Sequence, residues 1–224
     1  MTMDGEGARD HPTALVVDYD GTITDRDLLQ PAAYEFGDPD VVAALDRGLD
    51  EGRITLREEI VGEYATVRAP LPDVLAWVRE RTRIRPGFHE LLDLANERDW
   101  RVIVVSSGFH ELIEPVLERE AIDVELYANR VEPRPEGWLV DWRYGDGCPS
   151  CGQSCKRATV ERLAAGAAVV YVGDGYSDRC AAEAADRVFA IRGLARYLAR
   201  KGVPFESFSD FFDVASALAP TSAR

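Results

Sequence analysis

Two aspartates, Asp18 and Asp20, directly follow a short apolar run at residues 15–17. Side chains at positions i and i+2 of an extended chain point the same way, so the two carboxylates can share one site although Tyr19 lies between them. Paired carboxylates transfer protons or hold a cation. The alternative is a simple Asp-Gly turn in which an aspartate caps the backbone, and this segment alone does not separate the two interpretations.

Two later apolar segments, residues 101–105 and 168–172, also end in small or acidic residues. These are Ser106, Ser107 and Gly108 after the first segment, and Asp174 and Asp178 after the second. The carboxyl ends of parallel strands meet at one edge of a sheet, so we expect the three endings to converge. Crowded carboxylates repel one another unless a cation is present, and oxygen ligands suit Mg²⁺. Lys156 supplies a point charge suited to a phosphoryl group.

The elements that must position these residues alternate between strands and helices. Besides the three apolar strands, the spacing predicts a helix at 88–98, a strand with a β-hairpin at 124–144 and a short strand at 188–191. Strands that are apolar throughout indicate a mostly parallel sheet with helices on both faces. The predicted fold class is therefore α/β.

Residues 25–83 show only helical spacing of their apolar side chains, with no strand-like alternation. We therefore predict a small helical module inserted after the first strand. The alternative is that these helices pack on the main sheet as an ordinary crossover. Some 60 residues is long for one crossover, which favours the inserted module.

Composition and charge limit the partners. The chain has 224 residues, 46% of them hydrophobic, and a net charge of −14. That charge opposes broad binding to nucleic acid or to an anionic membrane. No run of about 18 apolar residues predicts a membrane span, and the polar, acidic residues 1–12 lack the pattern of a signal peptide. We expect a cytoplasmic protein with disordered tails at 1–12 and 219–224.

The motifs together resemble the haloacid dehalogenase superfamily of aspartate-nucleophile phosphatases. Residues 18–22 (DYDGT) match its first motif, Ser106 its second, Lys156 its third and residues 173–178 (GDGYSD) its fourth, in the family's order. The resemblance covers residues 13–218 and implies a Rossmann-like core, at 13–24 and 84–218, with a cap at 25–83. The helical block resembles the cap of the phosphoserine phosphatase subgroup.

Two short stretches indicate a narrower resemblance within that subgroup. Residues 151–156 (CGQSCK) and 193–198 (GLARYL) look like methionine-salvage phosphatases that act on 2-hydroxy-3-keto-5-methylthiopentenyl-1-phosphate, and like the related phosphocholine and phosphoethanolamine phosphatases. The resemblance implies a small phosphorylated metabolite as substrate. It does not decide the oligomeric state between a monomer and a homodimer.

The resemblance also implies roles for individual residues. Asp18 would be the nucleophile that forms an aspartyl-phosphate, and Asp20 the general acid and base. Mg²⁺ would be held by Asp18, Asp174 and the backbone carbonyl of Asp20, with Asp178 orienting this set. The residues implied to bind the phosphate are Thr22, Ser106, Ser107, Gly108 and Lys156. The candidates for contact with the leaving group are Asp27 and Arg57.

Each residue also has an ordinary structural explanation. Ser106 suits a turn, Lys156 a solvated helix, and Asp178 the N-terminus of a helix. Two other functions use the same residues: a phosphotransferase or mutase that returns the phosphoryl group to substrate, and a non-catalytic binding protein that keeps the fold. The presence of both Asp18 and Asp20 argues against the non-catalytic protein.

Three cysteines, Cys148, Cys151 and Cys155, follow a C-x₂-C-x₃-C spacing that can supply thiolates to zinc. The second half of a zinc ribbon is missing, so a fourth ligand would have to be Cys180 or a histidine such as His110. On the sequence alone we favour a loop whose thiols stay reduced and bind no metal.

Overall fold

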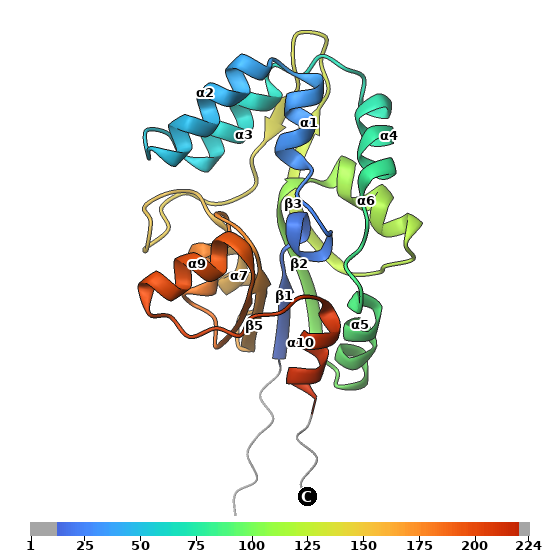
Figure 1. The fold of residues 1–224 in the computed structure, drawn as a ribbon, viewed down its shortest axis with the longest axis vertical. Coiled ribbons are helices and arrows are strands. Elements are labelled where there is room, and N and C mark those ends of the chain that lie inside the picture. Colours follow the sequence, from blue (N-terminus) through green and yellow to red (C-terminus); the bar gives the residue numbers. More distant parts are fainter. Residues whose placement is uncertain (1–12, 220–224) are drawn as a thin grey trace, which may run out of the picture.

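The computed structural model describes residues 13–219, and these form an α/β fold around one six-stranded sheet (Figure 1). The strand order is β4-β3-β2-β1-β5-β6, and only the pairing of β4 with β3 is antiparallel. The strands are β1 (Thr13–Val17), β2 (Arg101–Phe109), β3 (Glu125–Glu132), β4 (Leu139–Asp141), β5 (Ala168–Gly173) and β6 (Arg187–Ala190). The predicted fold class is confirmed.

Helices cover both faces of the sheet (Figure 1). Leu15 and Val17 of β1 pack in one buried cluster, and Ala14 and Val16 pack in another. The first cluster includes α5 (Phe88–Glu97), α6 (His110–Arg119) and α10 (Phe211–Leu218), and the second includes α7 (Lys156–Leu163), α8 (Arg179–Ala182) and α9 (Arg192–Lys201). Both faces of β1 are therefore buried, which explains why its sequence is apolar rather than alternating.

Of the five α-helices between β1 and β2, the first four lie over the carboxyl end of the sheet (Figure 1). They are α1 (Leu29–Phe36), α2 (Pro39–Asp50), α3 (Leu56–Tyr64) and α4 (Leu71–Arg81). We refer to residues 25–83 as the helical insertion. The chain enters and leaves it side by side, because the Asp25 N–H donates to the Arg83 carbonyl at 2.9 Å and the Arg85 N–H to the Ile23 carbonyl at 2.7 Å.

The structure departs from the sequence prediction at the end of β2. The strand continues past residue 105 to Phe109, with a shift of register against β3 between Val105 and Phe109. Such an irregularity bends the strand and redirects side chains. Ser106 lies in this stretch and is fully buried.

No helix among residues 13–219 combines the length and the apolar composition needed to cross a membrane. The tails predicted at residues 1–12 and 219–224 lie outside the described residues, apart from Ala219.

Candidate active site

The first two aspartates occupy a tight turn at the end of β1. The N–H groups of Ile23 and Thr24 donate to the carbonyls of Asp18 and Tyr19, five residues earlier in each case. This wide turn requires Gly21, whose φ is 78° and whose added Cβ would collide with the carboxylate of Asp174. The turn therefore lies in close contact with Asp174, which follows the carboxyl end of β5.

Lys156 contacts both Asp18, the candidate nucleophile, and Asp178 of the fourth motif. Its Nζ donates to Oδ1 of Asp18 and, at 2.8 Å, to Oδ1 of Asp178. All three side chains are at least 95% buried. Burial lowers the pKa of Lys156, but Asp178 and Asp18 raise it further, so the ammonium is held above its ordinary range. Lys156 is therefore a charged partner and not a solvated helix residue.

Both carboxylate oxygens of Asp178 accept hydrogen bonds from groups within the protein. Besides Lys156, its Oδ1 accepts from the Tyr171 hydroxyl at 2.8 Å, and its Oδ2 accepts from the N–H groups of Asp174 and Gly175 at 3.0 and 2.9 Å. These bonds hold the loop after β5. They leave Asp178 in a position to orient its neighbours rather than to bind a ligand.

Carboxylate oxygens of Asp18, Asp174 and Asp178 lie within 4.8 Å of one another. Thr22 Oγ1 joins the group, donating to Oδ2 of Asp18 at 3.1 Å. Burial, followed by repulsion from Asp178, raises the pKa of Asp18 well above its ordinary value and the pKa of Asp174 to about 6. A bound cation would relieve this repulsion, and an all-oxygen donor set fits Mg²⁺.

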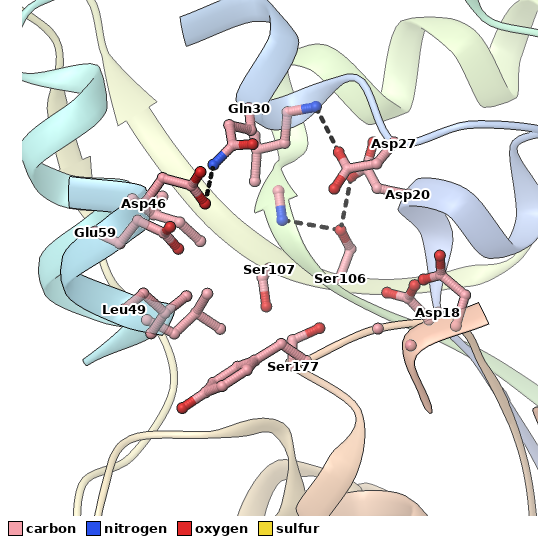
Figure 2. Close-up of a pocket in the computed structure, with 18 of the residues that line it drawn as sticks. Asp18, Asp20, Asp27, Gln30, Asp46, Leu49, Glu59, Ser106, Ser107 and Ser177 are labelled. Atoms are coloured by element: carbon pink, nitrogen blue, oxygen red, sulfur yellow. Dashed lines mark hydrogen bonds between the residues drawn. The ribbon is translucent and has the colours of Figure 1, made fainter. Parts of the chain in front are cut away.

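Asp20 faces a different partner. Its Oδ2 lies 3.5 Å from the Ser106 hydroxyl, which accepts from the Gly108 N–H at 2.9 Å (Figure 2). Burial, with repulsion from Asp27, raises the pKa of Asp20 to about 8. This carboxyl therefore holds its proton near neutral pH. Ser107, the next residue of β2, lines the same cavity.

Asp18, Asp20, Asp174 and residues 106–108 line one end of a cavity of about 330 Å³ between the core and the helical insertion. Figure 2 shows Asp18 and Ser106 at one side of this cavity and Leu49 and Glu59 at the other. The far side is acidic, with the carboxylates of Asp46, Asp50, Glu59 and Glu63, whereas Asp27 lies beside Asp20 (Figure 2). The cavity is large enough for a small molecule with a phosphate at the Asp18 end.

The two candidates for leaving-group contact lie in different places. Asp27 lines the cavity, where its Oδ1 accepts from the Leu29 N–H at 2.7 Å. Arg57 is not among the described lining residues; its guanidinium is half exposed and lies 3.4 Å from Asp146. The structure therefore does not bring Arg57 to the site.

Two arginines that the sequence analysis missed hold the site together. Arg192 donates to Oδ2 of Asp174 at 3.1 Å and to the Gly21 carbonyl at 3.1 Å. Arg85 donates to the carbonyls of Thr22 and Gly21 at 2.8 and 2.7 Å. Arg192 comes just after β6, so the rule that parallel strand ends converge would have found it.

A family model matches most of the chain. The model of the haloacid dehalogenase-like hydrolase family matches residues 15–183, a region that contains Asp18, Ser106, Lys156 and Asp174. The chain belongs to this family. The resemblance and the hydrolase class predicted from the motifs are thereby confirmed.

Similar members of this hydrolase family are phosphatases by name. The 2-hydroxy-3-keto-5-methylthiopentenyl-1-phosphate phosphatase of Geobacillus kaustophilus is 30% identical over 209 residues, covering 91% of this chain and 94% of that protein. The polyol phosphate phosphatase of Saccharomyces cerevisiae is 28% identical over 221 residues, covering 91% of this chain and 91% of that protein. The phosphoserine phosphatase of T. onnurineus shares the fold, with a TM-score of 0.70 at 21% identity over 95% of this chain and 98% of that one.

Proposed function

We propose that this hydrolase is a Mg²⁺-dependent phosphatase of small phosphomonoesters that works through an aspartyl-phosphate on Asp18. The observation that carries the proposal is that the carboxyls of Asp18, which is buried, and Asp20, which is partly buried, have different partners. Asp18 accepts a hydrogen bond from the Lys156 ammonium, whereas Asp20 lies beside the Ser106 hydroxyl and accepts from no lysine among the described residues. A nucleophile and a proton donor need such a difference.

In the first step, an oxygen of Asp18 attacks phosphorus and the bond from phosphorus to the leaving oxygen breaks. Asp20 gives its proton to that leaving oxygen. In the second step, water attacks phosphorus, Asp20 takes a proton from it, and the bond between phosphorus and Asp18 breaks. Lys156, Thr22 and Ser106, with the backbone of Ser107 and Gly108, are the proposed donors to the phosphoryl oxygens.

Asp18, Asp174 and the backbone carbonyl of Asp20 are the proposed ligands of Mg²⁺, and Asp178 orients them through Lys156 and the loop backbone. When bound, the ion neutralises negative charge on the carboxylates and on the phosphoryl oxygens. Its binding would also lower the raised pKa of Asp18, which favours the carboxylate form that a nucleophile needs.

We further propose that the helical insertion is a cap and that it selects a leaving group with a positive charge. Glu59 is 95% buried, yet its carboxylate accepts no hydrogen bond from any described residue. Burial raises its pKa to about 8, and repulsion from Glu63, Asp46 and Asp50 adds to this shift. A cationic amine would supply the missing countercharge, whereas an uncharged polyol would only exchange hydrogen bonds.

Release of inorganic phosphate from a generic aryl phosphate, with and without Mg²⁺, tests the chemistry. We expect turnover that requires the metal. Substrate isomerisation without free phosphate would support the phosphotransferase or mutase alternative instead. Binding without any turnover would support a non-catalytic protein.

The charge of the leaving group is tested with an isosteric pair, phosphocholine and 3,3-dimethylbutyl phosphate. We expect a kcat/KM at least about tenfold higher for the cation, which corresponds to about 1.4 kcal/mol. Glu59→Gln should reduce this preference, while Glu35→Gln, the same change on the exposed face of α1, should preserve it. Equal rates for the two esters, or faster hydrolysis of a polyol phosphate, would refute a cationic leaving group and leave the phosphatase proposal standing.

A further inference from the structure

Four cysteines meet beside the active site. The Sγ atoms of Cys148, Cys151, Cys155 and Cys180 all lie within 4.8 Å of one another, and none of the four forms a disulfide. Three come from the loop before α7, and Cys180 comes from α8. The phosphoryl chemistry proposed above uses none of these thiols.

The loop is folded so that its thiols face the same point. The Cys148 N–H donates to the Gln153 carbonyl at 2.9 Å, and the Gly152 N–H donates back to the Cys148 carbonyl at 2.7 Å. Gly152, with a φ of 69°, makes the reversal that this turn needs. The C-x₂-C pair is thus prearranged, and Cys155 follows at the start of α7.

We propose that these four thiolates bind one Zn²⁺ ion. Zinc is held tetrahedrally by sulfur at about 2.3 Å, which places neighbouring sulfurs about 3.8 Å apart. The four Sγ atoms, all within 4.8 Å of one another, already lie near that spacing. Four cysteine ligands leave no open position, so the site is structural rather than catalytic. Zinc binding displaces the thiol protons.

The sequence left two candidates for the fourth ligand, Cys180 and His110. His110 is engaged elsewhere: its Nδ1 lies 2.7 Å from Glu114, and its Nε2 accepts from the Ala128 N–H at 3.3 Å. Cys180 instead completes the set. This placement reverses the preference for free thiols drawn from the spacing of the first three cysteines.

The proposed zinc ties together the starts of two helices that carry active-site residues. Cys155 directly precedes Lys156, the first residue of α7, and Cys180 lies two residues after Asp178, at the start of α8. Lys156 and Asp178 form a buried ion pair at 2.8 Å. Zinc would therefore fix the start of α7 relative to the start of α8, and with them the positions of Lys156 and Asp178.

Metal analysis of the wild-type protein, purified without added metal or chelator, tests the site directly. We expect about one zinc per chain by elemental mass spectrometry. Cys151→Ser and Cys180→Ser should each lose at least about nine-tenths of it, because three ligands and a hydroxyl bind zinc far more weakly. Ser150→Ala, in the same exposed loop, is the matched control and should keep its zinc.

A second measurement does not depend on the folding of the variants. Wild-type protein loaded with Co²⁺ should show the thiolate-to-cobalt charge-transfer bands and the strong d–d bands of a tetrahedral sulfur site. Four freely alkylated thiols in metal-free native protein, two disulfides, or bound iron in place of zinc would each overturn the proposal.

Discussion

The Nζ of Lys156 lies 2.8 Å from Oδ1 of Asp178, and the same Nζ donates to Asp18, far away in the sequence. One buried ammonium thus joins the ends of β1 and β5 to the start of α7. Because the two carboxylates would otherwise repel each other in a buried site, the position of each depends on this lysine.

Replacing this lysine should destabilise the fold as well as stop catalysis. Lys156→Met leaves two buried carboxylates without their cation, a change that costs about 3–5 kcal/mol in free energy of unfolding. Urea unfolding without Mg²⁺ measures this loss. Lys201→Met, on the exposed end of α9, should stay within about 0.5 kcal/mol of the wild type. A Lys156→Met variant as stable as the control would contradict the pairing.

Substitutions of the two aspartates of the first motif should impair different properties of the enzyme. Asp18→Asn should abolish turnover and weaken Mg²⁺ binding, because an amide is a poor nucleophile and a poorer ligand. Asp20→Asn should lose most activity but keep Mg²⁺ affinity, since its proposed contact with the metal is a backbone carbonyl. Phosphate release and Mg²⁺ titration separate the two. Near-normal turnover by Asp18→Asn would end the covalent mechanism.

Phosphoserine should be a poor substrate although the fold is shared with phosphoserine phosphatases. It differs from phosphoethanolamine by one carboxylate, which the acidic far side of the cavity would repel. Arg179, the one cation among the described lining residues, lies over the rings of Tyr176 and Tyr197 at 4.2 and 4.7 Å. We expect kcat/KM at least about tenfold lower for phosphoserine. A value equal to or above that of phosphoethanolamine would show that an arginine reaches the substrate.

Stability should fall as the pH rises from about 5 to about 9. Burial raises the pKa of Glu59 to about 8 and that of Glu63 to about 7, so the folded protein binds more protons than the unfolded chain across this window. Glu59→Gln should therefore match the wild type near pH 5 and be more stable near pH 9, by on the order of 2 kcal/mol.

Urea unfolding at both pH values, without substrate or metal, measures this difference. Glu35→Gln serves as the control, because Glu35 is exposed on α1 and should give the wild-type slope. A Glu59→Gln variant with the same pH slope as the wild type would show that Glu59 ionises freely inside the cavity.

The sequence by itself determined the fold class and the edge of the sheet at which the candidate active site lies. The apolar runs before Asp18, Ser106 and Asp174 predict buried strands, and parallel strands bring their carboxyl ends together whatever lies between them. Lys156 was found through the family motif. Its partners were not evident from local sequence, because a lone lysine at a helix start is usually solvated.

Only the tertiary structure decided which distant residues complete each site. Glu59 and Glu63 lie four apart on α3, and helical spacing shows that they share a face but not that this face borders a cavity. Cys180 meets the other three cysteines because α7 and α8 pack side by side, a contact that no local pattern encodes. Secondary structure follows from short-range periodicity, whereas the distance between two side chains on different elements is set by how the whole core packs.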